Sequence, residues 1–467
     1  MNPEFKRNLW LEISPMRLVL MPALIGLALA AFASLKPDET ARTALTLSLL
    51  GFFAITIVWG CVQAQNALSR EVTEGTWDGQ RMSALTPWQM AWGKLFGSTI
   101  YTWYGGLMLL AIAGFSADYS PAPIEFLPEQ IGYSPAQKIF ILGCGLISTA
   151  LIVHALALAR ALQTHRKRPG SNLRFPILPF LLLLFLLYLF YELSSWHFHL
   201  MGRSVLWWGH HWDRQILFAT TLVFMAPWAL IHLWETMRRE LMLPNRVWWW
   251  PLFLLFWLIW SAGFVRGQEE QYSPFFFDGW YSFFAVWAIA VGFSVYILLF
   301  SARKDQGMWL RLIAACQNPN KRLLQHLEPG WLISFLIAVG LGSVAVILSP
   351  DPIPRLMTLL CTVAFIVRDI IWILWLNLAR NARRAEGAAL VSLIVAYGLL
   401  PLLFRSGEVS LLLPPLPDAP SSVALLILAN ALIQAAFCAG LFYNRWRQMF
   451  RPAEPTAYKV GARGGRP

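Results

Sequence analysis

Residues 45–65 read LTLSLLGFFAITIVWGCVQAQ, a run without a single charged side chain. A bilayer core about 30 Å thick is crossed by about 20 apolar residues in a helix. Such a segment must be helical, because lipid offers no hydrogen-bonding partner to an irregular backbone. The run therefore predicts a membrane-spanning helix.

The rest of the chain has the same character. Of its 467 residues, 57% are hydrophobic and 13% are charged, whereas soluble domains usually carry about 25% charged residues. This composition predicts an all-α, polytopic integral membrane protein whose main surroundings are the lipid bilayer. The formal net charge of +12 is expected to lie on the cytoplasmic side of the membrane, and not to bind nucleic acid.

Apolar runs long enough to span a bilayer recur along the chain. We predict about twelve of them, at residues 18–34, 45–65, 95–115, 139–159, 177–191, 216–234, 247–265, 279–300, 331–348, 356–376, 388–404 and 423–443. Residues 3–14 precede the first span, and Phe5, Leu9 and Ile13 recur there at helical spacing. That pattern predicts an amphipathic helix lying along the membrane surface.

The basic residues predict the orientation of the spans. With the N-terminus inside, 28 of the 37 Lys and Arg residues fall in inner segments and 8 in outer loops, while Arg368 lies within a span. Because cytoplasmic loops carry the excess of Lys and Arg, both termini are predicted to be cytoplasmic. No cleavable signal peptide is evident.

The twelve predicted spans divide into two sets of six. Three pairs of identical residues lie 232 positions apart: Gly75 and Gly307, Trp77 and Trp309, and Pro87 and Pro319. We therefore predict a first half at 1–240 and a second, diverged half at 241–450, as in transporters with parallel repeats. Residues 451–467 are rich in Gly, Pro and Arg and are predicted to be a disordered tail.

The second and third spans are joined by a polar segment, residues 70–94, that begins REVTEGTWDGQRM. Glu71 and Glu74 are three positions apart and are predicted to share one helical face. Gly75 is expected to end that helix, and Pro87 to begin the next one. A short helix across the end of the bundle would act as a lever on the spans at either side.

A plainer interpretation of this segment remains open. It can be a solvated connector in which Trp88 and Trp92 anchor the chain at the membrane surface.

The 70–94 segment resembles the corresponding part of the ABC-2 type permease family, the membrane subunits of ATP-driven exporters. That family shows an acidic helix, a Glu-Gly-Thr, a leucine-rich stretch ending in Thr-Pro or a similar pair, an aromatic residue, and a Gly-Lys that opens the third span. This chain has Glu71, Glu74-Gly75-Thr76, Leu85-Thr86-Pro87-Trp88 and Gly93-Lys94 in that order. The resemblance covers about 25 residues, and the six-span layout of each half extends it.

The resemblance implies that the segment is a coupling helix, which docks in a groove of a separate nucleotide-binding subunit. The residues implied in this contact are Glu71, Glu74, Gly75, Thr76, Pro87 and Trp88. ATP and Mg²⁺ would be bound by that partner. Gly93-Lys94-Leu95 lacks the upstream glycine and the hydroxyl of a P-loop, so this chain is expected to be neither an enzyme nor the holder of a cofactor.

The second half has a degenerate copy of the segment at residues 301–330. Gln306-Gly307-Met308 stands where Glu-Gly-Thr is expected, and Arg303-Lys304 stands where acidic residues are expected. Gln306, Gly307 and Trp309 are therefore second-half coupling candidates, and we expect the two halves to engage the partner unequally.

Ionisable and amide side chains within spans are a second set of candidates. Arg368 and Asp369 lie in the tenth predicted span, where each charge costs about 2.5–3.5 kcal/mol on insertion scales. Because adjacent residues point about 100° apart on a helix, each is expected to have its own partner. Asn430 and Gln434 share one face of the last span, where hydrogen bonding between helices is expected.

One outer loop concentrates histidines that are chemically able to bind zinc or copper. Its candidates are His197, His199, His210, His211 and Asp213. Interleaved tryptophans favour an interfacial element instead of a metal site. The five cysteines form no CxxC pair, so neither a disulfide framework nor a zinc site is predicted from them.

The sequence leaves three functions open. The first is a fused exporter permease in the bacterial cytoplasmic membrane, with a hydrophobic substrate expected from the apolar pathway. The second is a twelve-helix secondary transporter, which would need mid-membrane ionisable residues, and the third is a membrane-bound transferase using the histidine loop.

Overall fold

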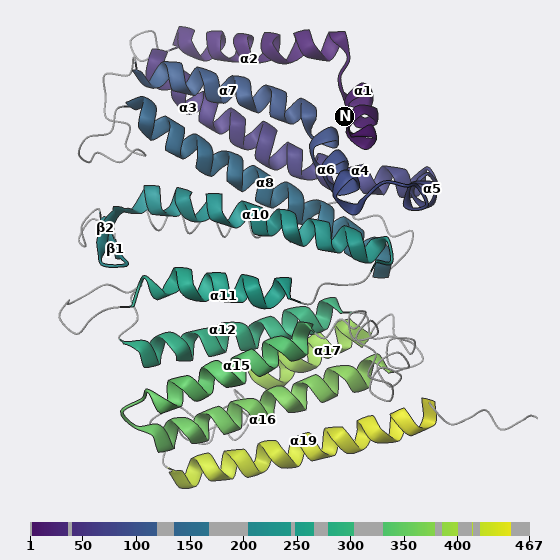
Figure 1. The fold of residues 1–467 in the computed structure, drawn as a ribbon, viewed down its shortest axis with the longest axis vertical. Coiled ribbons are helices and arrows are strands. Elements are labelled where there is room, and N and C mark those ends of the chain that lie inside the picture. Colours follow the sequence, from purple (N-terminus) through teal and green to yellow (C-terminus); the bar gives the residue numbers. More distant parts are fainter. Residues whose placement is uncertain are drawn as a thin grey trace, which may run out of the picture. The chain divides into compact units, whose positions relative to one another are not determined.

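The computed structural model describes residues 2–35, 40–118, 135–167, 204–243, 248–265, 279–302, 330–378, 385–399, 413 and 421–449. The prediction of an all-α protein is confirmed for these residues, in which one short β-hairpin is the exception. The chain divides into two compact units. The first contains α1 to α11 and the second contains α12 to α19 (Figure 1).

The first unit is a bundle of long helices with short elements at its two ends. Its elements are α1 (Pro3–Glu12), α2 (Pro15–Leu35), α3 (Thr40–Phe52), the π-helix η2 (Phe53–Trp59), α4 (Gly60–Thr73), α5 (Trp77–Arg81), α6 (Pro87–Ser98), α7 (Ile100–Asp118), α8 (Pro135–Lys167), β1 (Ser204–Trp207), β2 (His210–Asp213), α10 (Arg214–Glu240) and α11 (Trp249–Ala262).

Apolar side chains hold this bundle together in two main clusters. One joins α8 to α10 and α6, through residues such as Leu158 and Leu233, which are buried. The other joins α2, α3, η2, α7 and α8, through residues such as Phe52 and Val153. Small residues on α8, such as Ala155 and Ala157, are fully buried and let the neighbouring helices approach closely.

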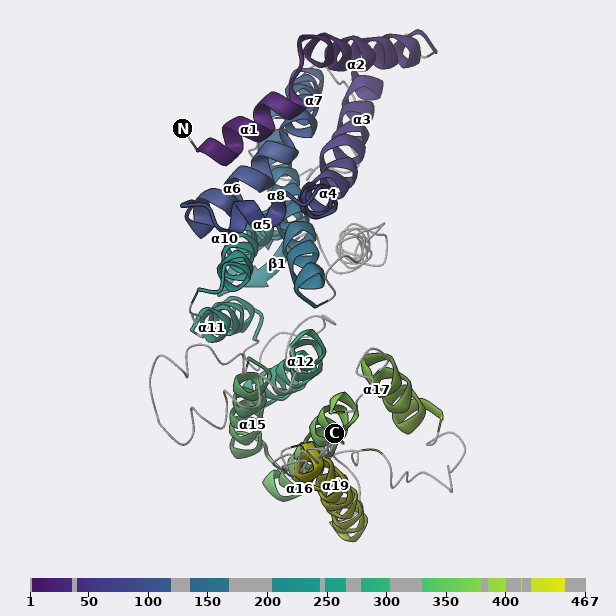
Figure 2. The ribbon, with the colours of Figure 1, turned by 90° about the vertical axis from the view of Figure 1, so that its right-hand side faces the viewer.

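The two ends of the first unit carry different elements. Helix α1 is seen nearly end-on in Figure 1 and along its length in Figure 2, so it lies across the direction of the long helices. It begins after Asn2, whose side chain accepts a hydrogen bond from the Glu4 amide at 3.1 Å. The β1–β2 hairpin lies at the opposite end of the bundle from α4, α5 and α6 (Figure 1).

The second predicted span contains a stretch of π-helix. Helices α3, η2 and α4 form one continuous helix, Thr40–Thr73. Within η2, the carbonyl oxygen of Thr56 accepts a hydrogen bond from His154 Nε2 on α8 at 2.7 Å. His154 is completely buried, so it packs within the bundle and joins α8 to η2.

The described residues of the second unit form helices. They are α12 (Trp280–Ser301), α15 (Gly330–Ile347), α16 (Pro352–Asn377), α17 (Ala385–Ile394), the π-helix η5 (Val395–Leu399) and α19 (Ser421–Met449). Helix α12 packs on α15 and α16 packs on α19. Buried side chains such as Val295, Ile373 and Ala389 form one core, and Phe365 and Ile427 belong to another.

Among the described residues, nine helices are long and apolar enough to cross a membrane. They match nine of the twelve predicted spans. Those predicted at 247–265 and 388–404 correspond to the shorter apolar helices Trp249–Ala262 and Ala385–Leu399, and the one predicted at 177–191 lies outside the described residues. The chain is thus a multi-pass membrane protein by helix length and composition, while the count of twelve and the side of the termini stay predictions.

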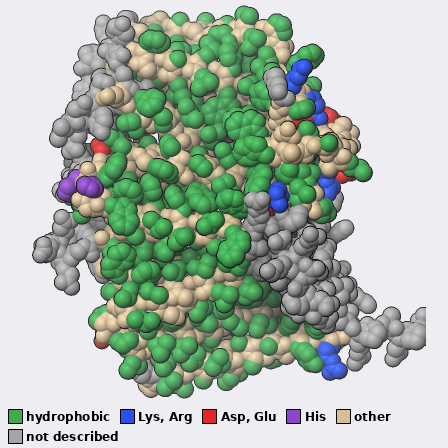
Figure 3. All heavy atoms as spheres, in the orientation of Figure 1, with side chains coloured by type: hydrophobic (Ala, Val, Ile, Leu, Met, Phe, Trp, Pro, Cys, Tyr) green, Lys and Arg blue, Asp and Glu red, His purple; other side chains and the backbone are tan. Residues whose placement is uncertain are grey.

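The surface agrees with this assignment. Figure 3 shows hydrophobic side chains over the flanks of the long helices of each unit. In the first unit, Lys, Arg, Asp and Glu side chains gather at the end where α4, α5 and α6 lie, and histidines appear at the hairpin (Figure 3). Apolar flanks with charged ends are typical of helices that span lipid.

The boundary between the two units follows α11, near residue 264. The predicted halves instead meet at residue 240, before the seventh span. Aromatic contacts join α11 to the elements that precede it, such as that between Trp207 and Trp260 at 4.7 Å. The predicted repeat at 241–450 is not tested by this division, and the tail at 451–467 lies outside the described residues.

Candidate functional site

The 70–94 segment folds as a helix end, a short helix and a new helix. Helix α4 ends at Thr73, and Gly75 adopts φ 71°. The Thr76 amide donates to the carbonyl oxygen of Glu71 at 2.9 Å, and the Gly75 amide donates to that of Val72 at 3.2 Å. This pair of bonds is a Schellman motif. The prediction that Gly75 ends the helix is confirmed.

Helix α6 begins with a proline in its first turn and a capping box, both formed by residues that are close together in the sequence. Pro87 occupies its first turn, and the Thr86 hydroxyl accepts a hydrogen bond from the Gln89 amide at 3.2 Å. The Gln89 side chain accepts in return from the Thr86 amide at 3.0 Å, which completes a capping box. The predicted new helix at Pro87 is confirmed.

The amine of Lys94 is the centre of a buried polar network. Its Nζ donates to Glu4 Oε1 at 3.0 Å and to Gln80 Oε1 at 2.7 Å, and it also bonds the carboxylate of Glu71. The same amine lies 5.0 Å from the centre of the Trp77 ring. The Lys94 side chain is 1% exposed, so these groups replace water around a buried cation.

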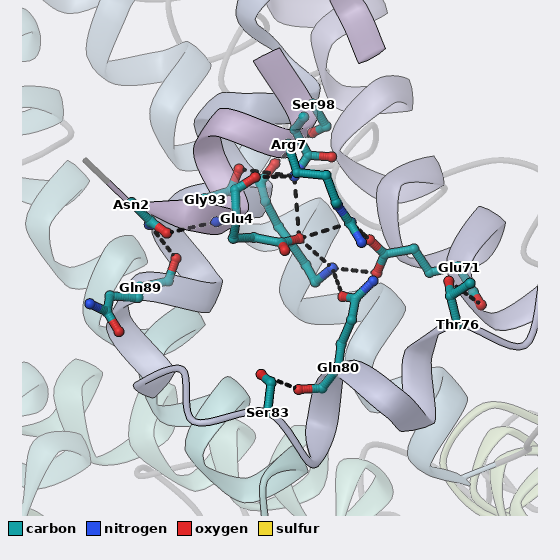
Figure 4. A network of polar contacts seen from close by, with 12 residues as sticks. Asn2, Glu4, Arg7, Glu71, Thr76, Gln80, Ser83, Gln89, Gly93 and Ser98 are labelled. Carbon is teal, nitrogen blue, oxygen red and sulfur yellow. Dashed lines mark hydrogen bonds and ion pairs between the residues drawn. The ribbon is translucent and has the colours of Figure 1, made fainter. Parts of the chain in front are cut away.

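The charges of this network balance. Arg7 forms ion pairs with Glu4 at 3.1 Å and with Glu71. Two basic side chains therefore face two carboxylates, with Gln80 as a neutral member (Figure 4). We call these five residues, Glu4, Arg7, Glu71, Gln80 and Lys94, the Lys94 network. It joins α1, α4, α5 and α6.

Two glycines on α6 let α1 approach closely enough for these contacts. A Cβ added at Gly93 would lie 2.6 Å from the Cβ of Glu4 and 2.9 Å from the backbone nitrogen of Phe5. Gly97, one turn further on, faces Asn8 in the same way. The spacing of the two glycines matches the Gly-x-x-x-Gly pattern of closely packed membrane helices.

Helix α5 is also attached to the C-terminal end of α10. An Nη of Arg81 donates to the carbonyl oxygen of Glu240 at 3.1 Å, and its Nε lies 3.8 Å from the Glu240 carboxylate. Helix α5 has five residues. Its position is thus set by contacts to the helices around it, since so short a helix is not stable by itself.

The outward side of the segment presents acidic and apolar side chains. Glu74 and Thr76 are exposed at the end of α4, and the Asp78 side chain is 85% exposed on α5. Met82 is 89% exposed and Trp88 is 46% exposed. This surface, made of these five residues, is called the α5 surface below.

The structure separates two residues that the sequence predicts on one face. Glu71 is buried in the Lys94 network, whereas Glu74 is the exposed C-cap of α4. The reason is that α4 ends at Thr73, so the helical spacing of three does not govern where Glu74 points. Glu71 therefore belongs to the interior of the site, and Glu74 to the α5 surface.

The intramembrane candidates form a second polar cluster, in the second unit. Arg368 donates from Nε and Nη2 to Asp369 Oδ1 at 2.9 and 2.7 Å. The two side chains pair with each other, a contact that was not predicted, and each also has a partner of its own on another helix, as expected. Asp369 Oδ2 also accepts hydrogen bonds from Tyr296, at 2.7 Å, and Tyr397.

The last span contributes to this cluster. Gln434 accepts a hydrogen bond from Arg368 Nη1 at 2.6 Å, which is the expected bond between helices. Asn430 is half-buried one turn earlier on α19.

The histidine loop is described at its hairpin. His210 and His211 are exposed on β2, and neighbouring residues of a strand point to opposite faces. Asp213 caps α10, accepting hydrogen bonds from the amides of Gln215 at 2.9 Å and Ile216 at 3.3 Å. Within the described residues, no group of three or more His, Cys, Asp or Glu side chains is placed to hold a metal ion.

The remaining predicted candidates lie outside the described residues. They are Gln306, Gly307 and Trp309 of the second-half segment, together with His197 and His199. Comparison of the chain with family models, with curated proteins and with solved structures gave no match.

Sequence reasoning missed three members of the network, Glu4, Arg7 and Gln80. The sequence held a weak signal, since Glu4 and Arg7 lie three apart on a helix that is otherwise apolar on one face. A lysine at the start of an apolar span, such as Lys94, also calls for a counter-charge. Neither signal identifies which acidic and basic side chains contact each other in the fold.

Proposed function

We propose that this chain is the permease subunit of an ATP-driven exporter of the ABC-2 type. A separate nucleotide-binding subunit would bind ATP and Mg²⁺ and act on the chain through the 70–94 segment. The observation that carries the proposal is the Lys94 network, which ties the short helix α5 to α1, α4 and α6.

The network supports a mechanical role for α5. A partner that moves α5 would pull on Lys94 at the start of the third span and on Glu71 at the end of the second. It would also pull on α10 through Arg81. Because buried ion pairs resist separation, these helices would move with α5 and not independently of it.

The α5 surface indicates what the partner must offer. Its acidic residues, Glu74 and Asp78, call for basic side chains, and Met82 calls for an apolar pocket. Glu71 has a different part in this proposal, because it holds Lys94 and does not reach the surface. On the predicted orientation the α5 surface faces the cytoplasm, where ATP is available.

The test is purification of the full chain from its own membranes in the presence of ATP and Mg²⁺. The proposal expects a stoichiometric partner with a P-loop and ATPase activity. Glu74→Arg and Met82→Asp should each release that partner. His210→Arg, a matched change at the opposite end of the first unit, should retain it. Absence of an ATPase from the wild-type complex, or its retention by both surface variants, would refute the proposal.

The Arg368 cluster favours a secondary transporter as the second candidate. Ionisable groups within a span are a functional hypothesis by default, and Asp369 is buried there. Four hydrogen bonds already satisfy that carboxylate, however, which favours a structural bridge. Transport driven by a proton gradient without ATP, and abolished by Asp369→Asn, would favour this alternative.

A further inference from the structure

A cavity of about 550 Å³ lies in the first unit between α2, the α3–η2–α4 helix and α7. Its size is within the range of about 300–1,000 Å³ that is usual for small-molecule sites. It belongs neither to the Lys94 network nor to the α5 surface.

The cavity has apolar walls along most of its length. Leu24 and Phe32 on α2, Ile55 on η2 and Leu109 on α7 line it. Arg17 and Phe32 lie at opposite ends of its α2 wall, which at 1.5 Å per residue is about 22 Å long. That exceeds half of a bilayer core about 30 Å thick, so the walls can accommodate an extended hydrocarbon chain from one leaflet.

The cavity is open to the lipid side of the bundle. Leu24 is 54% exposed and Phe32 is 49% exposed, although both line it. Helix α2 is fixed to the bundle by buried residues such as Met21 and Ile25, which form the inner part of the same cavity wall. A ligand can therefore enter sideways from the membrane.

One end of the cavity is polar and carries an excess of positive charge. Arg17 and Arg70 both line it, and both pair with Glu12, at 3.0 and 3.5 Å. Arg70 also donates to Gln63 at 3.3 Å. Glu12 is the single acidic residue among the described lining residues, so two guanidinium groups share one carboxylate and leave one positive charge unmatched.

The geometry points to an anionic phospholipid as the occupant of this cavity. Its acyl chain would lie along α2, and its phosphate would accept from the donors of Arg17 and Arg70 that Glu12 leaves unused, since these side chains are 47% and 58% exposed. Guanidinium groups suit phosphate oxygens because they present paired donors. The lipid would come from the leaflet at the α1 and α5 end. The inference requires only that the spans lie in a membrane and is independent of the proposed function.

The headgroup must supply the selectivity. An acyl chain gains little by leaving one apolar environment for another. The charge at the polar end should therefore distinguish an anionic lipid from a zwitterionic one. Each arginine is expected to contribute about fivefold to that preference, which corresponds to ~1 kcal/mol for a basic side chain at an anionic surface.

The test uses the full chain reconstituted in vesicles of equal phosphatidylglycerol and phosphatidylcholine. After mild extraction, the lipids that stay bound are identified by native mass spectrometry. The wild-type chain should retain phosphatidylglycerol in preference. Arg17→Gln and Arg70→Gln should each lower that preference about fivefold. Lys6→Gln, an exposed basic residue of α1 outside the cavity, should leave it unchanged.

A second pair of variants tests the position of the acyl chain. Ala28 lines the cavity, whereas its neighbour Leu27 is 68% exposed and does not line it. Ala28→Trp should displace the bound lipid, and Leu27→Trp should not. Equal retention of both lipids by the wild-type chain would overturn the inference. So would a change of oligomeric mass with Ala28→Trp and no lipid bound, because a second copy of the chain would then fill the cavity.

Discussion

Replacing Lys94 with glutamine is expected to release α1 from the first unit. The substitution removes the one cation that faces Glu4, Glu71 and Gln80 together. Arg7 would then face two carboxylates alone. An uncompensated negative charge would remain in a buried site, and the chain can relieve it by letting α1 leave.

The burial of these groups sets the size of the effect. The Lys94 side chain is 1% exposed, and those of Glu4 and Glu71 are 4% and 10% exposed. Removal of one partner of a buried pair costs about 3–5 kcal/mol. Arg7 still neutralises one carboxylate, so the lower end applies. At 1.4 kcal/mol for each factor of ten, that is about a 100-fold shift in the docking of α1.

Hydrogen exchange read by mass spectrometry measures this shift directly, because local opening exposes helix amides to exchange. The amides of α1 should exchange about 100-fold faster in Lys94→Gln, while those of α8 keep their protection. Lys6→Gln is the matched control, since Lys6 is an exposed lysine of α1.

A double substitution separates charge from packing. Adding Glu71→Gln to Lys94→Gln leaves Glu4 and Arg7 as a balanced pair. The double variant should therefore be less perturbed than the sum of the two single variants, by an interaction energy of about 0.5–3 kcal/mol. Unchanged exchange in α1, or strict additivity of the two substitutions, would show that the network does not hold α1 by charge.

Three further outcomes follow from the same structure. Gly93→Ala should loosen α1 and speed its hydrogen exchange, because the new Cβ would meet backbone and side-chain atoms of α1 within 3 Å. At Gly79 a new Cβ would meet no atom within 4 Å, so Gly79→Ala should leave the exchange of α1 unchanged. Thr86→Ala removes the cap of α6 and should cost about 1 kcal/mol, seen as faster exchange in its first turn. Asp369→Asn should lower the free energy of unfolding of the detergent-solubilised chain by about 3–5 kcal/mol, as measured by thermal denaturation. Adding Arg368→Met should restore most of that loss, and failure to do so would exclude charge burial as its cause.

The spans were largely predictable, because the thickness of a bilayer fixes how many apolar residues a helix needs. The span predicted at 247–265 shows the limit of that reasoning. Its helix ends at Ala262, where the hairpin meets it: the Trp208 amide donates to the Gly263 carbonyl oxygen at 3.0 Å. Hydropathy counts residues, and it contains no information about a contact that ends a helix.

Within the candidate site, only the features that depend on a single residue and its own backbone could be predicted from the sequence. Gly75 and Pro87 act through their own backbones, so their effects on helix ends follow from residue type. The contact between Glu4 and Lys94 joins residues 90 positions apart, and its geometry depends on the glycines of α6. The pairing of Arg368 with Asp369 was not predicted for another reason. A long guanidinium side chain can fold back on its neighbour, which an angle measured at the Cα atoms does not reveal.

The π-helix η2 makes the second span sensitive to its length. One residue more or less turns everything that follows in a helix by about 100°. The wide turn at Phe53–Trp59 therefore sets which side of α4 meets α1 and α6. Deletion of one residue from this stretch would carry Glu71 away from Lys94. The span therefore anchors the chain in the membrane and also fixes the rotation of α4 about its own axis. That rotation depends on the number of residues in the span.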